Sequence, residues 1–424
     1  MIPRAAIPIG NEEIVAAFRS LFEGVEAVRD KVTTFENDLA SYLGSKKVFG
    51  LNSGRTALYT ALQALNLKRG DEVIVPAYTC AIVVEVTLRL GLKPVLVDAD
   101  PATYNIDPEL LPQAVSSRTK AVIPVHLFGQ PCEMERIAEM AAKYSLYIIE
   151  DVAQALGAEY KKAKMGTFGD LAIFSFGPGK SMTSGEGGAL SINDEELVEK
   201  VTAIESKLPN PDFSWFVHCL KNIVPMKVFS NPHYYALIKR FLQESLKKAD
   251  RAILENCQRL LGEDDQGHLS PTIALAKMPL LSAEVARIQL RKLDGFNQKR
   301  IRNAEVLTKL LDRSDNSIQL PRVSPDRKTT FTRYPIRMLK GSRDEVIRGL
   351  VERGIDAGTP YDYLTDLYRS LRAKAPNAAT LANSLLTVPN HPLLKPSDTV
   401  KIAETLFNKL PRNRNTGTRQ KSLR

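Results

Sequence analysis

A lysine behind a glycine-rich turn is the residue of this chain best suited to chemistry. An apolar run ends at Phe174-Ser-Phe176, and Gly177-Pro-Gly179 then turns the chain and presents Lys180. Most lysines are solvated surface charges. A lysine held at the edge of a buried sheet can instead lose its proton and form a covalent bond with a carbonyl group. Both interpretations are open for Lys180 taken alone.

Two adjacent acids close another apolar run. Ile148 and Ile149 lead into Glu150 and Asp151, at what would be the carboxyl edge of a sheet. Acids in such a position can be solvated loop residues, or caps of the next helix. They can also belong to a site, because ligands of α/β sheets bind beyond the carboxyl ends of the strands.

The start of a predicted helix is a third candidate. Ser53 and Gly54 follow Asn52 and precede the helical pattern that begins at Arg55. Unpaired N–H groups at a helix start, with the positive end of the helix dipole, suit a phosphate. The alternative is a serine that only caps the helix.

Together these features predict a site for pyridoxal phosphate (PLP). This cofactor needs a lysine for its carbonyl carbon, an acid that keeps its ring nitrogen protonated, and a cup for its phosphate. Lys180, Asp151 and Ser175, with the helix start at Ser53 and Gly54, meet these needs. No metal site is predicted, because the four cysteines share no close spacing.

The elements that must position these residues lie between residues 47 and 192. Apolar runs rich in β-branched residues alternate there with helical patterns, which predicts an α/β fold with a mostly parallel central sheet. The predicted strands are Val73–Val75, Pro94–Val97, Ala121–Val125, Tyr147–Ile149, Leu171–Phe174 and Ala189–Ile192. The predicted helices are Arg55–Leu65 and Glu133–Tyr144.

After residue 207 the alternation stops. A long helix at Ser282–Leu311 and a strand at Thr332–Met338 are followed by helices at Arg343–Arg353 and Asp398–Leu410, which predicts a smaller α+β domain. The predicted organisation is an N-terminal arm and helix at 1–30, a large cofactor-binding domain at 31–207, a helical insertion at 208–276, a long linking helix at 277–324, a small C-terminal domain at 325–410 and a basic disordered tail at 411–424.

Several long motifs in the same order resemble the DegT/DnrJ/StrS aminotransferases. They include NSGRTAL, GDEVIVPAYT, IIEDVAQALGAEY and MGTFGDLAIFSFGPGKSMTSGEGG. The resemblance is strong over residues 10–205 and looser over 280–410. It implies fold type I of the PLP-dependent transferases, the aspartate aminotransferase-like fold, and a homodimer with its sites at the subunit interface.

The resemblance also implies residue roles. Lys180 matches the Schiff-base lysine, and Asp151 matches the partner of the ring nitrogen. Gln154 matches the residue beside the hydroxyl edge of the ring, and Ser175 matches a serine that binds the phosphate. Gly54 and Arg55 match a Gly-Thr pair whose amides bind it as well.

The chain departs from the family pattern at three places. Arg55 replaces the usual threonine, and its guanidinium could bind phosphate or substrate, or point away. Cys80 stands where an aromatic residue usually stacks on the ring, so either Tyr78 takes over that role or the stacking is weaker. Residues 275–278 replace the Asn-x-Arg-Met that often reaches a partner subunit's phosphate, which puts that contact in doubt.

The predicted activity is transfer of an amino group from glutamate to a keto-sugar, most plausibly nucleotide-linked, for the synthesis of cell-surface polysaccharide, glycolipid or a related secondary metabolite. Glutamate as the donor is implied by the resemblance. Two alternatives are a PLP-binding regulatory protein without turnover and a PLP-dependent enzyme that eliminates water or ammonia from a sugar. The intact Lys180 and Asp151 favour the aminotransferase.

Charge distribution gives little support to a nucleic-acid partner. The net charge is +10, and the last 14 residues carry five basic residues and no acid. We expect a cytoplasmic protein without a signal peptide or transmembrane helix. Between Lys207 and Arg251, eight basic residues and three acidic ones are interleaved with aromatic residues. This pattern suits either burial against the protein or a contact of residues 208–250 with an anionic membrane surface.

Overall fold

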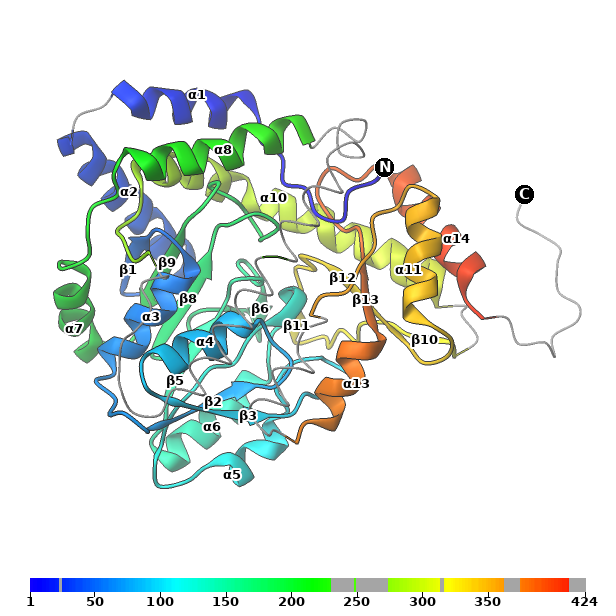
Figure 1. Cartoon of the computed structure of the whole chain (residues 1–424), viewed down its shortest axis with the longest axis horizontal. Helices are drawn as coiled ribbons and strands as arrows, with labels where there is room; N and C mark the ends of the chain where they lie inside the picture. The colour runs from blue at the N-terminus through cyan, green and yellow to red at the C-terminus, as the bar shows by residue number, and fades with distance from the viewer. Residues whose placement is uncertain (23–24, 230–247, 249–273, 313–315, 362–373, 412–424) are drawn as a thin grey trace, which may run out of the picture.

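A computed structural model describes residues 1–22, 25–229, 248, 274–312, 316–361 and 374–411. Residues between Lys47 and Ile192 form a seven-stranded sheet with the strand order β1-β9-β8-β5-β4-β2-β3 (Figure 1). β9 runs antiparallel to β1 and β8, and the other pairs are parallel. The strands are β1 (Lys47–Leu51), β2 (Glu72–Pro76), β3 (Lys93–Val97), β4 (Thr119–Val122), β5 (Tyr147–Asp151), β8 (Leu171–Ser175) and β9 (Gly188–Ile192). The predicted α/β fold is confirmed.

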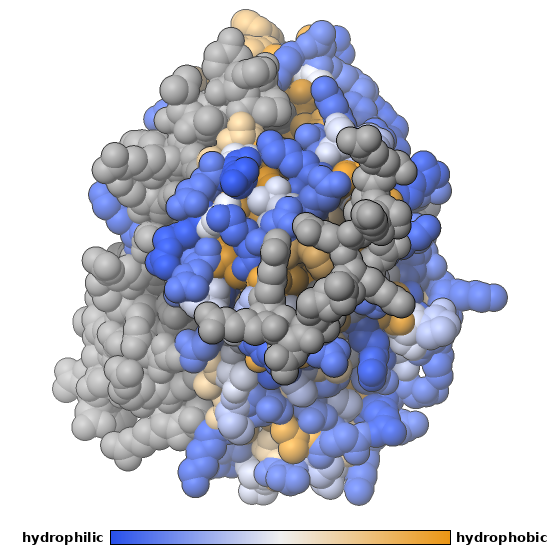
Figure 2. Space-filling model, turned by 90° about the vertical axis from the view of Figure 1, so that its right-hand side faces the viewer, coloured by the Kyte–Doolittle hydropathy of each residue, from blue (hydrophilic) through white to orange (hydrophobic). Residues whose placement is uncertain are grey.

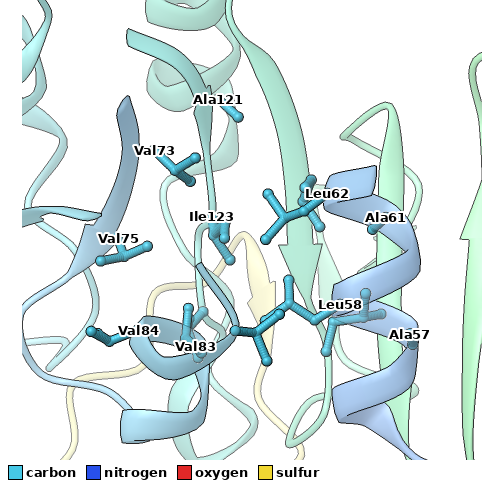
Figure 3. Close-up of a cluster of buried hydrophobic side chains, with 14 of the residues drawn as sticks. Ala57, Leu58, Ala61, Leu62, Val73, Val75, Val83, Val84, Ala121 and Ile123 are labelled. Carbon is cyan, nitrogen blue, oxygen red and sulfur yellow. The ribbon is translucent and has the colours of Figure 1, made fainter. Parts of the chain in front are cut away.

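One face of the sheet is covered by helices α3 (Gly54–Ala64) and α4 (Ala81–Arg89). Leu58 and Leu62 of α3 point toward Val73 and Ile123 on the sheet (Figure 3). These leucines recur at helical spacing while the strand residues are β-branched, so each element presents the apolar face that its own period predicts.

The other face is covered by α2 (Val25–Leu43), α6 (Met134–Tyr144) and the first half of α10 (Leu280–Leu311). α10 continues into a second core, where Leu307 and Leu311 pack with the C-terminal unit. The helix therefore contributes to both cores, in agreement with the long helix predicted at 282–311.

The C-terminal unit has a small antiparallel sheet, in the order β10 (Ile318–Gln319), β12 (Tyr334–Met338) and β13 (Leu385–Val388). Its helices are α11 (Arg343–Glu352), α13 (Pro376–Ser384) and α14 (Pro396–Lys409). Ser342 caps α11 by accepting a hydrogen bond from the Glu345 amide at 3.3 Å, and Gly354 follows its end with a φ of 78°. Among the residues that Figure 2 colours on this side of the molecule, most are hydrophilic, with separate apolar groups.

Shorter elements complete the described chain. They are α1 (Asn11–Arg19), η1 (Ser20–Phe22), η2 (Pro108–Leu110), α5 (Leu111–Ala114), η3 (Leu127–Gly129), β6 (Glu159–Tyr160), β7 (Ala163–Lys164), α7 (Glu196–Glu205), α8 (Phe213–Phe229) and β11 (Arg327–Lys328). No helix within the described ranges is long and apolar enough to cross a membrane. The predicted tail beyond residue 411 and most of the predicted insertion beyond residue 229 lie outside the described residues.

Candidate active site

Strand register brings the predicted phosphate residues to one edge of the sheet. Leu51 of β1 pairs with Gly188 of β9, and Gly188 pairs with Ser175 of β8. The turn that follows Leu51 therefore lies in the same row as the end of β8. Ile173, two residues before Ser175, pairs with Asp151 of β5. Residues separated by up to 137 positions in the sequence are thus neighbours at one edge.

The start of α3 lies directly against Ser175. A Cβ atom on Gly54 would lie 2.9 Å from Cβ of Ser175, and one on Gly188 would overlap the Ser53–Gly54 peptide. Only glycine permits this approach. Ser53 caps α3, because its Oγ accepts a hydrogen bond from the Thr56 amide at 3.1 Å. The cap predicted as an alternative is present, and the helix start still faces Ser175.

Arg55 adds a guanidinium to this helix start. Its side chain is half-buried, and its Nε is buried without a hydrogen-bond partner among the described residues. A buried, unsatisfied charged donor is costly. An anion held at the α3 start would satisfy it, so the residues present fit a phosphate group.

The two carboxylates at the end of β5 have different environments. Asp151 is 7% exposed, and its Oδ1 accepts a hydrogen bond from the Ala153 amide at 3.0 Å. Burial raises the pKa of Asp151 above its usual range, while the Ala153 amide and the nearby charges of Lys180 and His126 act in the opposite direction. A cation placed beside this carboxylate would stabilise its ionised form.

Glu150 is instead enclosed in the protein. Its carboxylate accepts hydrogen bonds from the amides of Gly166, Phe168 and Gly169 at 2.7–2.9 Å, and it contacts Nε2 of His126 at 3.1 Å. Nδ1 of His126 accepts a hydrogen bond from the Cys132 amide at 3.1 Å. Nε2 of this ring is therefore the nitrogen that donates to Glu150, and the group anchors the loop after β7.

Lys180 lies near Asp151 at the end of the predicted turn. The turn uses Gly179 at a φ of 78°, a conformation that favours glycine. Lys180 is half-buried. Burial lowers the pKa of its amine, and the positive charge of Arg333 acts in the same direction, whereas Asp151 acts against it. An amine with a lowered pKa is more often neutral, which is the form that attacks a carbonyl or accepts a proton.

Gln154, Tyr361 and Tyr78 form a connected group of side chains beside the candidate site. The Gln154 Nε2 donates to the Tyr361 hydroxyl at 2.8 Å, and its Oε1 accepts from the Phe128 amide at 3.0 Å. The rings of Tyr78 and Tyr361 meet edge to face with centroids 5.5 Å apart. Cys80, the N-cap of α4, has an electrostatic interaction with Lys180. Stacking of Tyr78 on a cofactor ring stays a prediction.

Sequence reasoning missed Tyr361 and Arg333. Tyr361 lies 207 residues from its partner Gln154, and no local motif marks Tyr361 or Arg333. The segment at 275–278 is also brought to the site edge: Lys277 pairs with Leu51, and the Met278 amide donates to the Gly50 carbonyl at 3.2 Å. This segment therefore contacts the end of β1 within its own chain.

Comparison with known proteins identifies the family. The model of the DegT/DnrJ/EryC1/StrS aminotransferase family matches residues 8–210 and 244–407. The chain belongs to this family. The predicted family is therefore confirmed, and the chain is a member of a group of PLP-dependent transaminases with the type I fold.

Individual relatives match long parts of the chain, and one of them is a sugar transaminase. A pleiotropic regulatory protein of Geobacillus stearothermophilus is 32% identical over 89% of this chain and 88% of its own length. A dTDP-3-amino-3,4,6-trideoxy-alpha-D-glucose transaminase of Streptomyces venezuelae is 28% identical over 93% of this chain and 91% of its own. The match to an uncharacterized protein of Methanocaldococcus jannaschii, at 46% identity, spans 46% of this chain and only half of that protein.

Solved structures share the fold. The crystal structure of DesV from Streptomyces venezuelae is 27% identical, covers 94% of both chains and has a TM-score of 0.70. The predicted type I fold is confirmed by this likeness. The roles of individual site residues in this chain stay predictions, supported by the geometry at the sheet edge.

Proposed function

We propose that this chain binds PLP and transfers an amino group from glutamate to a nucleotide-linked keto-sugar, for cell-surface polysaccharide, glycolipid or related secondary-metabolite synthesis. The observation that carries the proposal is the convergence of Lys180, Asp151 and the anion cradle of Gly54 and Ser175 at one edge of the sheet. The family and the dTDP-sugar transaminase relative support it.

The residues that would hold the cofactor are those predicted. Lys180 would bind its carbonyl carbon, Asp151 its ring nitrogen, and the α3 start with Ser175 and Arg55 its phosphate. When bound, PLP supplies an electron sink for the bonds of the donor's α-carbon. Asp151, ionised in the complex, would hold a proton on the ring nitrogen and so keep that sink effective. The neutral amine of Lys180 would take the proton from the donor's α-carbon.

Chemical labelling of the lysine tests this proposal. Borohydride reduction of the PLP-loaded protein, followed by peptide mapping, should label Lys180. Lys180→Ala should abolish transamination while the circular dichroism spectrum and the unfolding transition stay those of a folded protein. Lys143, exposed near the end of α6 and part of no site, provides a matched control as Lys143→Ala. Label on another lysine, or turnover by Lys180→Ala, would contradict the assignment.

Substrate identity needs a second experiment. Glutamate should change the absorbance band of the bound cofactor, and mass spectrometry on a panel of nucleotide-linked keto-sugars should then detect an aminated product. A PLP-binding regulatory protein would show the cofactor band without the change on adding amino donors. An elimination enzyme would release water or ammonia from the sugar with no amino group gained. The name of the Geobacillus relative makes the regulatory alternative worth this direct comparison.

Two further predictions concern assembly and location. The predicted homodimer is tested by sedimentation equilibrium. Of residues 208–250, for which a membrane contact is predicted, the structure describes 208–229 and Lys248. In α8, Phe213 is 70% exposed while Cys219 and Ile223 are buried. Sedimentation with anionic and neutral liposomes at low salt tests it: equal binding, or binding that persists when 213–248 is replaced by a short linker, contradicts the contact.

A further inference from the structure

Arg300 of α10 is a buried arginine that contacts the turn after Lys180. It is 2% exposed, and burial lowers the pKa of its guanidinium, which is still a cation at neutral pH. Nη2 donates to the Ser181 carbonyl at 2.8 Å, and Nη1 donates to Oδ1 of Asn297 at 2.8 Å. None of the ion pairs between described residues includes Arg300. Apolar residues of similar volume would fill this space at a lower desolvation cost, so space-filling alone does not account for the guanidinium.

The hydrogen bond to Ser181 connects the lysine turn to another element. Lys180 and Ser181 lie in a loop that closes where the Ser184 amide donates to the Phe176 carbonyl at 2.9 Å. In the part of the chain that the structure describes, no other hydrogen bond from outside this loop reaches residues 177–182. Without Arg300, the backbone around Lys180 would be hydrogen-bonded only within its own loop.

The same guanidinium is connected to the segment that follows Asp151. Asn297, which accepts from Arg300, donates through Nδ2 to the Leu156 carbonyl at 3.0 Å. A Cβ atom on Gly157 would lie 2.5 Å from this Nδ2, so the segment lies directly against α10. Arg300 and Asn297 therefore join the backbone on the Asp151 side of the site to the backbone on the Lys180 side.

We propose that Arg300 is a positioning residue for Lys180 and acts through the Ser181 carbonyl. This inference rests on the proposed aminotransferase function. The lysine amine must lie close to the carbonyl carbon of the cofactor and to the α-carbon of the donor, and a misplacement of about 1 Å can lower a rate about 100-fold. The planar guanidinium holds two acceptors in one fixed geometry, which an ammonium group does not.

The titration of Lys180 in the cofactor-free protein tests the proposal. The charged and titratable groups that act on its amine are Cys80 of α4, Asp151 of β5 and Arg333 before β12, and all three stay in Arg300→Gln. Acetic anhydride acetylates only the neutral amine, so peptide mapping over a pH series gives the midpoint of Lys180 labelling. Arg300→Gln should raise this midpoint by about 1 pH unit, because a loosened turn exposes the amine to water and burial then lowers its pKa less.

The rate with glutamate is a second readout. In the PLP-loaded protein, Arg300→Gln should slow the glutamate half-reaction about 10- to 100-fold. The half-saturating concentration of glutamate should stay unchanged, because Arg300 does not touch the donor. Arg300→Lys should show smaller changes in the same direction, since its ammonium keeps the charge but not the two-acceptor geometry.

Two controls separate positioning from stability. Arg89→Gln removes another buried arginine, whose Nη2 lies 2.7 Å from Oε1 of Glu85 within α4. It should lower the free energy of unfolding, because it leaves a buried carboxylate without its partner, but it should not move the labelling midpoint of Lys180. Arg302→Gln, on the exposed side of α10, should change neither quantity.

The outcomes separate this inference from the function on which it rests. A wild-type midpoint in folded Arg300→Gln, or an equal rise in Arg89→Gln, would overturn the positioning role. If Arg300→Gln does not fold, the same measurements on Arg300→Lys decide, and wild-type values there would overturn it as well. If glutamate does not change the cofactor spectrum of the wild type, the proposed function fails, whereas the midpoint, measured without cofactor or donor, still shows whether Arg300 positions Lys180.

Discussion

The last two residues of β5 are adjacent carboxylates that lie on opposite faces of the central sheet, and their hydrogen-bond environments differ. On one face, Glu150 accepts three backbone hydrogen bonds and contacts His126, so its charge is fully solvated by protein dipoles. On the other face, Asp151 accepts one hydrogen bond, from Ala153, and burial raises its pKa. A buried carboxylate that accepts several hydrogen bonds stabilises the fold. A buried carboxylate that accepts only one still has oxygen lone pairs with which to bind a cation. Perturbed groups of the second kind cluster at functional sites.

The largest expected difference between the two carboxylates is in the reaction rate of their variants. Asp151→Asn removes the charge that would hold a proton on the cofactor ring. Loss of about 4 kcal/mol of transition-state stabilisation lowers the rate of the glutamate half-reaction roughly a thousandfold. Stopped-flow absorbance measures that rate. A variant within about tenfold of the wild type would show that Asp151 is not the ring partner.

Glu150→Gln should affect stability instead. Glutamine has one acceptor oxygen, and its NH₂ group would face a backbone N–H that also donates. We expect the free energy of unfolding to fall by about 3 kcal/mol, the scale for breaking a buried charged network. Urea unfolding measures it, with the exposed Glu139→Gln on α6 as the control. Unchanged stability, or a rate loss as large as that of Asp151→Asn, would remove the distinction between the faces.

Arg55→Gln tests whether the Arg55 side chain contacts the phosphate of the cofactor. The variant should bind PLP about tenfold more weakly, or ~1.4 kcal/mol, because the phosphate loses its contact with the guanidinium. Fluorescence titration gives the dissociation constants for PLP and for pyridoxal, which lacks the phosphate. Pyridoxal binding should not change. An equal loss for both ligands would mean that Arg55 supports the site without contacting phosphate.

The smallest expected effect is the pH dependence of stability without the cofactor. Because folding raises the pKa of Asp151, its ionisation opposes folding. Wild type and Asp151→Asn should differ least at a pH below the unfolded aspartate pKa, about 3.9, where the group is protonated in both states. As the pH rises through the folded pKa, the wild type should lose stability relative to the variant. Urea unfolding of the cofactor-free proteins from pH 3 to 7 tests this. The opposite trend would show that the Ala153 amide, Lys180 and His126 together outweigh burial in setting the pKa of Asp151.

Much of the large domain could be predicted from local pattern. Each predicted strand appears within a few residues of its expected bounds, because a strand buried on both faces must be a continuous apolar run. Lys180 and Asp151 could be singled out for a related reason: each closes a strand or a glycine turn, and strands carry their ends to one edge of the sheet. Ser53 could be read as a cap from its place before a helical pattern, and it is one.

Tertiary structure alone decided which of the adjacent acids faces the site, and which distant residues join them. The alternation of a strand sends Glu150 and Asp151 to opposite faces, but register and neighbouring loops determine which face holds the site. Tyr361 and Arg333 reach Gln154 and Gly179 through the packing of the C-terminal unit, at sequence separations of 207 and 154 residues. Local sequence determines the period and the ends of an element, whereas contacts between elements depend on the shapes of both surfaces, and no single segment contains that information.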